Sequence, residues 1–184
     1  MKRILLPLVL ALAGCASQPQ SLVLSPLEPV ITTQANPSQS VAISSVDLRT
    51  ETFLARIQRE GEAATLLNAN TNPRQLVEQG LSQGLQQMGY RVGPDGQVQI
   101  AIELERLLVD VEQTRLKHDA SSQLVARVTV TEGQRALVKR YQTRGTFNGA
   151  LRAEPARLER ELNDRLAQLL DAIINDPELH QFIQ

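Results

Sequence analysis

Residues 98–111 read VQIAIELERLLVDV, and the architecture of the chain can be worked out from this stretch. In its first half, apolar residues alternate with polar ones, at Val98, Ile100, Ile102 and Leu104. The second half keeps the period of two in the opposite phase, at Leu107, Val109 and Val111. A period of two predicts a β-strand with one buried face. The change of phase predicts a β-bulge near Glu105 and Arg106, because one extra residue returns both halves to the same face.

Two more strands follow this stretch. Residues 124–130 alternate in the same way, and a third run extends roughly from Ala136 to Phe147. The residues between them, Glu132-Gly133-Gln134, have the composition of a tight turn. Strands joined by short turns pair in opposite directions, so this region is predicted to form an antiparallel meander.

Shorter strands are predicted ahead of the meander. Residues 41–48 hold apolar side chains in two successive phases, which predicts a strand with an internal bulge. These side chains are Val41, Ile43, Val46 and Leu48. Residues 53–58 (FLARIQ) and 64–69 (ATLLNA) flank Gly61 and are predicted to form a β-hairpin.

Two amphipathic helices are predicted. Asn72 can cap the first of them and Pro73 suits its first position, while Gly89 ends it, so we expect a helix over residues 73–88. Its apolar stripe consists of Leu76, Val77, Gly80, Leu81, Gly84, Leu85 and Met88. The second helix begins at Pro155 and ends before Pro177. Its stripe consists of Leu158, Leu162, Leu166, Leu169, Leu170, Ile173 and Ile174.

The order of these elements predicts an α+β fold. We expect a mainly antiparallel sheet with the two helices packed on one face. The other face is expected to be more polar, with Gln99, Glu103, Gln123, Arg127 and Thr129.

The first residues have the layout of a signal peptide. Lys2 and Arg3 precede an apolar run from Ile4 to Ala13, which is shorter than the ~20 residues that span a bilayer. The sequence Leu12-Ala13-Gly14-Cys15 resembles the lipobox of bacterial lipoproteins. The resemblance implies cleavage between Gly14 and Cys15 and attachment of acyl chains, including palmitate, to Cys15. Several chains together anchor a protein stably.

The residues after the lipobox suggest a location and a tether. Ala16 and Ser17 stand where an aspartate would retain a lipoprotein in the inner membrane, which by the same resemblance implies the outer membrane, facing the periplasm. We therefore expect a signal peptide over 1–14, a lipidated, proline-rich tether over 15–39 and a periplasmic domain over 40–184. Whether Leu22–Leu24 docks on the domain as an edge strand is left open.

Composition excludes several classes of function. The 184 residues carry a formal net charge of −1, and removal of Lys2 and Arg3 with the signal peptide changes it to −3, so a nucleic-acid partner is not expected. Aromatic residues make up only 3% and tryptophan is absent, which predicts an aliphatic core. One cysteine and two histidines exclude a cysteine-based or histidine-rich metal site and leave open only a mixed site with carboxylates, so we predict neither a metal site nor another cofactor.

Four residues are candidates for an interaction site. Asp47 and Arg49 lie two apart in a strand and share a face, either as an exposed ion pair or as a partner contact or loop clamp. Gly80 and Gly84 fall on the apolar stripe of their helix, where glycine is unfavourable. They imply either tight packing on the sheet or a groove that binds an apolar ligand.

One group of residues has the chemistry of an enzyme. Asp110, Glu112, His118, Asp119 and Ser121 include the side chains used in acid-base and nucleophilic catalysis. Their spacing near a strand turn is typical of solvated surface, so no catalytic residues are predicted. Gly93-Pro94-Asp95-Gly96 follows a helix and precedes a strand, the reverse of a phosphate loop, and is expected to be a turn.

Five features lie along nearly the full length of the chain: the lipobox, VDLRT (46–50), MGYRVGPDG (88–96), the long strand 98–111 and the closing residues 176–183. In these features the chain as a whole resembles the YajG family of Gram-negative lipoproteins. The resemblance implies an envelope lipoprotein without an assigned activity. By analogy with small accessory lipoproteins, we predict a non-enzymatic interaction module for another envelope protein. The alternatives are a carrier of lipid or another amphiphile, and an enzyme.

Overall fold

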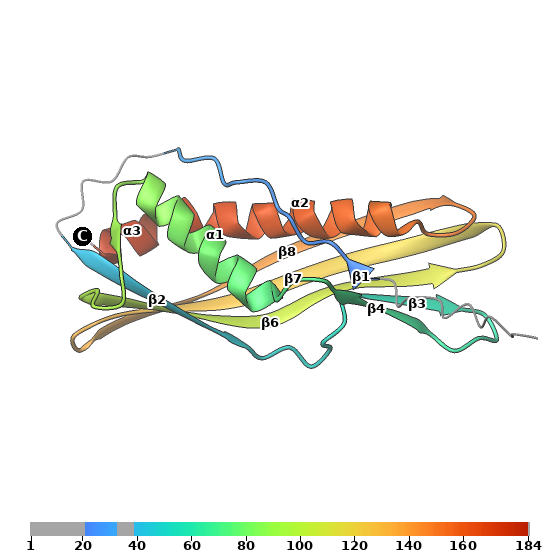
Figure 1. Cartoon of the computed structure of the whole chain (residues 1–184), viewed down its shortest axis with the longest axis horizontal. Coiled ribbons are helices and arrows are strands. Elements are labelled where there is room, and N and C mark those ends of the chain that lie inside the picture. Colours follow the sequence, from blue (N-terminus) through green and yellow to red (C-terminus); the bar gives the residue numbers. More distant parts are fainter. Residues whose placement is uncertain (1–20, 33–38, 184) are drawn as a thin grey trace, which may run out of the picture.

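The computed structural model of the chain describes residues 21–32 and 39–183 (Figure 1). This part contains one eight-stranded sheet and three helices. In chain order the elements are β1 (Ser21–Leu22), β2 (Ser40–Asp47), β3 (Ala55–Arg59), β4 (Thr65–Ala69), α1 (Pro73–Gln87), β5 (Arg91–Val92), β6 (Val98–Gln113), β7 (Lys117–Glu132), β8 (Arg135–Ala150), α2 (Pro155–Ile174) and α3 (Pro177–Ile183).

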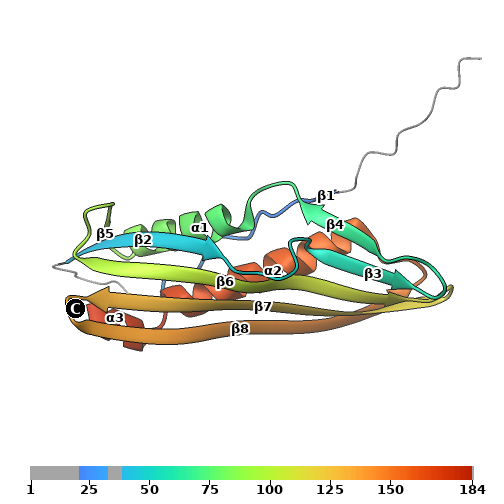
Figure 2. The same cartoon turned by 90° about the horizontal axis from the view of Figure 1, so that it is seen from below.

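All three helices lie on one face of the sheet (Figures 1 and 2). We call the opposite face of the sheet the outer face. The α+β class is therefore confirmed, with three helices in place of the two predicted. No helix in the two described ranges is both long enough and apolar enough to cross a membrane.

The antiparallel meander is confirmed by β6, β7 and β8. Each of these strands is 16 residues long, and β7 pairs with both neighbours over nearly its whole length. Gly133 has a φ of 57° at the turn between β7 and β8, a conformation that glycine adopts without strain. The strands are longer than the alternating runs, because polar side chains also continue the ladders.

The predicted bulge in β6 is present. The register between β6 and β7 shifts between Leu104 and Arg106, which leaves Glu105 as the extra residue. Leu104 and Leu107 are each 1% exposed and belong to the same core. The bulge therefore keeps both halves of the strand facing the helices.

The prediction of a mainly antiparallel sheet is wrong, because the sheet is mixed. Four of the seven strand pairings are parallel: β1 with β4, β2 with β5, β2 with β6 and β3 with β6. Along one edge of β6, β2 covers residues 98–104 and β3 covers residues 109–113. The chain between β2 and β6 is long and contains α1, which allows the two strands to run parallel. The prediction failed because alternation within a strand does not indicate the direction of its neighbour.

The predicted bulge in the strand at 41–48 is wrong as well. β2 and β6 pair without a register shift from Val41 with Val98 to Asp47 with Leu104. The apolar side chains of the second phase, Val46 and Leu48, are 44% and 54% exposed. The change of phase therefore places Val46 and Leu48 on the exposed side of the chain and does not mark a bulge.

Both predicted helices are confirmed, together with the hairpin of β3 and β4. The Asn72 side chain accepts a hydrogen bond from the backbone N–H of Arg74 at 3.1 Å, which caps α1. All seven stripe residues of α2 are buried. Helix α3 was not predicted, because Pro177 was interpreted only as the end of the second helix; α2 ends at Ile174, and Pro177 begins α3.

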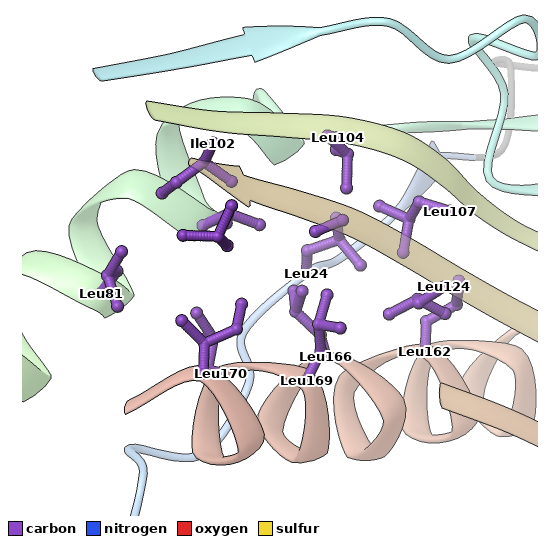
Figure 3. Close-up of a cluster of buried hydrophobic side chains, with 14 of the residues drawn as sticks. Leu24, Leu81, Ile102, Leu104, Leu107, Leu124, Leu162, Leu166, Leu169 and Leu170 are labelled. Atoms are coloured by element: carbon purple, nitrogen blue, oxygen red, sulfur yellow. The ribbon is translucent and has the colours of Figure 1, made fainter. Parts of the chain in front are cut away.

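Leucine and isoleucine side chains from both layers fill the core (Figure 3). Leu162, Leu166 and Leu170 of α2 meet Leu124 of β7 and Leu107 of β6, and all are at most 1% exposed. Tyr90 is the one aromatic side chain among the buried hydrophobic residues of the described ranges. The aliphatic core expected from composition is confirmed.

Residues 21–32, which we call the strap, lie along α2. Leu22 and Leu24 are 0% and 4% exposed and belong to the core. The side chains of α2 bind the strap backbone, with Asn163 Oδ1 accepting from the N–H of Ser25 at 2.8 Å. The sequence left open whether Leu22–Leu24 docks on the domain as an edge strand. In the structure this segment does dock, since β1 pairs with β4.

A close approach of two backbones at Gly96 provides the first testable prediction. A Cβ atom at Gly96 would collide with the backbone of Val41 and Ala42, which cannot rotate away as a side chain can. Gly96→Ala is expected to lower the free energy of unfolding by about 1–3 kcal/mol in urea denaturation. Gly93→Ala is the control, because a Cβ there meets nothing within 4 Å. Equal stability of the two variants would contradict the close approach.

Candidate functional site

The residues with enzyme chemistry lie on two different faces of the sheet. The outer face carries Asp110, Glu112, Asp119 and Ser121, which the ladder of β6 and β7 pairs with one another. His118 is 3% exposed on the helix side, where its Nδ1 lies 3.1 Å from the carbonyl oxygen of Leu151. The sheet therefore separates the imidazole from the carboxylates and does not assemble them into one site.

Asp47 and Arg49 form an ion pair where β2 ends. Arg49 donates from Nε and Nη2 to the two carboxylate oxygens of Asp47, at 2.9 and 2.8 Å. The Arg49 side chain is 4% exposed, and its Nη1 has no hydrogen-bond partner among the described residues. The hydrogen bond from Arg49 outweighs burial and holds the pKa of the Asp47 carboxyl below its usual value. Asp47 and Arg49 thus bind each other at the start of the loop between β2 and β3. Their role as a partner contact stays a prediction.

Gly80 and Gly84 face α2. A Cβ atom at Gly80 would lie 2.7 Å from Cδ1 of Leu170, and one at Gly84 would overlap Ile174. The glycines thus bring α1 close to α2, whereas the sequence suggested packing on the sheet. A hollow of about 200 Å³ lies beside Gly80 and is lined in part by the strap. Pockets that bind small molecules are usually about 300–1,000 Å³.

The predicted lipidation site lies outside the described residues. Gly14 and Cys15 both precede Ser21, where the described chain begins. Cleavage between them and acylation of Cys15 stay predictions.

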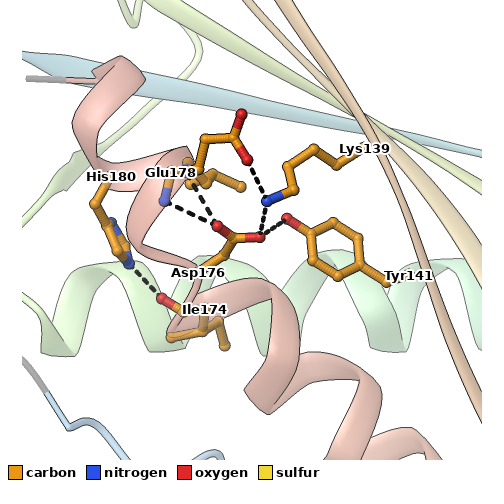
Figure 4. A network of polar contacts seen from close by, with 7 residues as sticks. Lys139, Tyr141, Ile174, Asp176, Glu178 and His180 are labelled. Carbon is orange, nitrogen blue, oxygen red and sulfur yellow. Dashed lines mark hydrogen bonds and ion pairs between the residues drawn. The ribbon is translucent and has the colours of Figure 1, made fainter.

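A polar cluster that the sequence reasoning missed joins α3 to β8 (Figure 4). Asp176 Oδ2 accepts from Lys139 Nζ at 2.6 Å and from the Tyr141 hydroxyl at 2.7 Å. Its Oδ1 accepts from the backbone N–H groups of Glu178 and Leu179 at 2.9 and 3.3 Å. Asp176 is therefore both the N-cap of α3 and the bond between that helix and the sheet. Aspartate directly before a proline is a helix-start signal that could have revealed it.

The cluster shifts the pKa values of its members. Burial alone would raise the pKa of Asp176, but hydrogen bonds from Lys139 and Tyr141 and from two backbone N–H groups hold it below its usual value. Burial, and then the hydrogen bond to Asp176, raise the pKa of the Tyr141 hydroxyl. The hydrogen bond to Asp176 also raises the pKa of Lys139. Lys139 lies between the carboxylates of Asp176 and Glu178, and such mutual pairing is typical of a structural cluster.

His180 completes this corner of the fold. It is 9% exposed, its Nδ1 lies 3.0 Å from the hydroxyl of Tyr90, and its Nε2 contacts the carbonyl oxygen of Ile174. Both ring nitrogens are therefore engaged. Within residues 21–32 and 39–183, no three His, Cys, Asp or Glu side chains are grouped closely enough to hold a metal ion.

Strand β8 forms a long edge of the sheet. Among the described strands it pairs with β7 alone. The N–H of Leu151 donates to the carbonyl oxygen of Leu116 at 2.8 Å, which continues this ladder. Because hydrogen-bonded pairs alternate in an antiparallel ladder, odd-numbered residues of β8 bond to β7 and even-numbered residues direct their N–H and C=O groups to the edge. Arg165 of α2 accordingly donates to the carbonyl oxygen of Arg144 at 3.2 Å.

The outer face is polar, as predicted. Arg127 and Arg140 both contact Glu105, at 2.8 and 2.7 Å, and their side chains are 46% and 54% exposed. These charged side chains are thus paired with one another. By alternation Leu108 and Val125 also fall on this face, but each is only 1% exposed and adds almost no apolar surface.

Comparison with known proteins places the chain in a family. A family model described as "Uncharacterized lipoprotein" matches residues 26–184. The chain belongs to this lipoprotein family. It is similar to "Uncharacterized lipoprotein YajG" of Escherichia coli strain K12, with 29% identity over 189 residues that cover 100% of this chain and 97% of the relative. The YajG protein of E. coli O6:H1 strain CFT073 matches with the same identity and coverage. The predicted membership in the YajG family is confirmed.

A solved structure shares the fold of this family member. The crystal structure of protein XCC0632 from Xanthomonas campestris matches with a TM-score of 0.59 and 11% identity, over 89% of this chain and 97% of the other. At this identity the likeness concerns the fold alone. The description of the lipoprotein family and the names of the YajG relatives state no activity.

Proposed function

We propose that this lipoprotein is a lipid-anchored, non-enzymatic module that binds another protein of the cell envelope. Acyl chains on Cys15 hold it in the outer membrane, with residues 40–184 facing the periplasm. Membership in a lipoprotein family supports the anchor, and the lipobox supports Cys15 as its site. Ala16 and Ser17, which stand in place of an inner-membrane retention signal, support the outer membrane.

The edge of β8 that no described strand covers carries the proposal of a protein partner. Apart from the Arg144 carbonyl, which Arg165 occupies, its even-numbered residues present backbone donors and acceptors along a 16-residue strand, which is the template that strand addition uses. Val138, Arg140 and Asn148 are exposed residues of this set. Proteins that avoid such pairing usually have short, bulged or covered edges. The length of this edge favours an extended segment of a partner as the bound element.

Photo-crosslinking at the edge tests this proposal. With a photoreactive residue at position 148, wild type is expected to give one specific adduct with an envelope protein in living cells. Thr146→Pro removes an N–H from the edge and leaves the bonds to β7 intact, so the adduct should fall about tenfold, which corresponds to ~1.4 kcal/mol. Thr146→Val keeps the N–H and should retain the adduct.

Two other outcomes would overturn parts of the proposal. An adduct that is unaffected by Thr146→Pro would rule out strand addition at β8. Mass spectrometry of membrane-extracted protein, with Cys15→Ser for comparison, measures the anchor directly. An unmodified Cys15 in wild type would rule out lipid anchoring.

The lipid-carrier alternative finds no specific support in the geometry. The hollow beside Gly80 is about 200 Å³, and the glycines are in contact with α2. We therefore retain the interaction module as the proposed function.

A further inference from the structure

Two leucines stand exposed at one end of the molecule. Leu116, in the turn between β6 and β7, is 79% exposed, and Leu151, after β8, is 63% exposed. They are neighbours, because the N–H of Leu151 donates to the carbonyl oxygen of Leu116 at 2.8 Å. We call these two residues, with Arg115, Lys117 and Arg152, the apolar tip.

Folding does not account for the leucine at position 151. It is the one residue other than glycine with a positive φ, 60°, among the residues that the structure describes. This conformation favours glycine or asparagine, and leucine adopts it with strain. A large apolar side chain that is neither buried nor suited to its backbone indicates a contact outside this chain.

Basic residues adjoin the two leucines in the sequence, at positions 115, 117 and 152. In the part of the chain that the structure describes, Arg115 and Arg152 have no ion-pair partner, whereas Lys117 pairs with Asp119 at 2.8 Å. A hollow of about 690 Å³ lies between the turns at this end, lined by three arginines (Arg59, Arg115 and Arg152) and by two glutamates. Apolar side chains flanked by cations match the surface of an anionic bilayer.

The start of the described chain lies toward the same end. β1 runs parallel to β4 and pairs Ser21 with Asn68, three residues beyond Thr65, where β4 leaves the hairpin turn. The other strand of that hairpin pairs Arg59 with Gln113, next to the tip. Figure 2 shows β1 in the half of the molecule that carries these turns. The N-terminal end of β1 therefore faces the side of the tip. Cys15 stands six residues before Ser21 in the sequence, and six residues reach at most about 20 Å.

We propose that the apolar tip contacts the anionic phospholipid surface of the membrane in which Cys15 is anchored. The inference rests on the proposed anchor, which brings the tip within reach of the bilayer. Leu116 and Leu151 enter the interfacial region, while Arg115 and Arg152 pair with phosphate groups. The contact sets the orientation of the domain and leaves β8 extending away from the membrane.

The absence of tryptophan from the chain allows a direct test. Full-length protein with Leu116→Trp is reconstituted in vesicles of phosphatidylethanolamine and phosphatidylglycerol with brominated acyl chains. We expect blue-shifted emission and loss of most fluorescence by quenching. Val138→Trp is the control, because Val138 is 60% exposed on β8 but lies about 40 Å along the strand from Ala150. Its emission should remain unshifted and unquenched.

Two changes separate the contact from a structural role. Arg115→Gln with Arg152→Gln, or replacement of phosphatidylglycerol by phosphatidylcholine, should reduce quenching of the tryptophan at position 116. Leu151→Gly should also reduce quenching, while it raises the melting temperature because it relieves the positive φ. A role in folding alone would lower the melting temperature instead.

Vesicle flotation reports the anchor separately from the tip. Protein that floats but shows no quenching at position 116 overturns the tip contact and leaves the anchor intact. Unacylated protein that is quenched supports the tip and overturns the anchor. Protein that neither floats nor is quenched overturns both.

Discussion

Replacement of Asp176 by asparagine is expected to lower the free energy of unfolding by about 3 kcal/mol. The side chain of Asp176 is 10% exposed and compensates Lys139 at 2.6 Å, so its loss leaves a partly buried ammonium group without its nearer carboxylate partner. Lys139 is 27% exposed and can regain part of its hydration, which places the effect at the lower end of the range for broken buried pairs. Chemical denaturation at pH 7 measures the change.

Glu178→Gln is the matched control for this variant. Glu178 contacts the same Lys139 at 2.8 Å, but its side chain is 61% exposed. Exposed ion pairs contribute about 0–1 kcal/mol, so this variant should remain close to wild type. Equal losses in the two variants would show that charge on Lys139 alone, and not the buried position of Asp176, determines the effect.

The same cluster predicts how stability depends on pH. Because the pKa of Asp176 is lowered in the folded state, its contribution is present above the unfolded pKa of about 3.9 and is lost as pH falls toward the folded pKa. The pKa values of Lys139 and Tyr141 are raised, so their contributions are present below about pH 10 and are lost at higher pH. Asp176→Asn should weaken both limbs of the profile. An unchanged acid limb would assign that limb to other carboxylates, such as Asp47.

Leu162→Ala should destabilise the protein by about 2–5 kcal/mol, which is the range for deleting a fully buried leucine. Leu162 is 0% exposed on α2 and lies against Leu124 of the sheet (Figure 3). The backbones of α2 and of the sheet fix the distance between the two layers of the core, so neighbouring side chains can fill the space left by Leu162 only in part. Thermal and urea denaturation both report the loss.

Leu116→Ala tests the same substitution outside the core. Leu116 is 79% exposed, so its truncation should change the free energy of unfolding by less than about 0.5 kcal/mol. A small effect at both positions would mean that the helix layer and the sheet are loosely packed. A large effect at Leu116 would mean that the tip is held against the rest of the chain.

The candidate sites show where local reasoning from the sequence ends. The glycines at positions 80 and 84 correctly indicate a close approach, but the approaching element is α2, more than eighty residues away in the sequence. Similarly, Asp176 carries a helix-start signal, whereas its pairing with Lys139 depends on how α3 lies across β8. Residue spacing reveals that a position is special, and only packing reveals what it meets.

Local patterns in the sequence were enough to place β6, β7, β8, α1 and α2 and to identify the buried faces of β6 and α2. Periods of 2 and 3.6 are local properties, so the bulge of β6 and the core stripe of α2 follow from the residues themselves. The sequence motifs likewise sufficed for the family. Three features became visible only in the folded chain: the parallel pairing of β2 and β3 with β6, the close contact of α1 with α2, and the contact of Leu116 with Leu151. An alternating strand buries the same face in either direction, so the direction and the neighbour depend on the packing of distant segments.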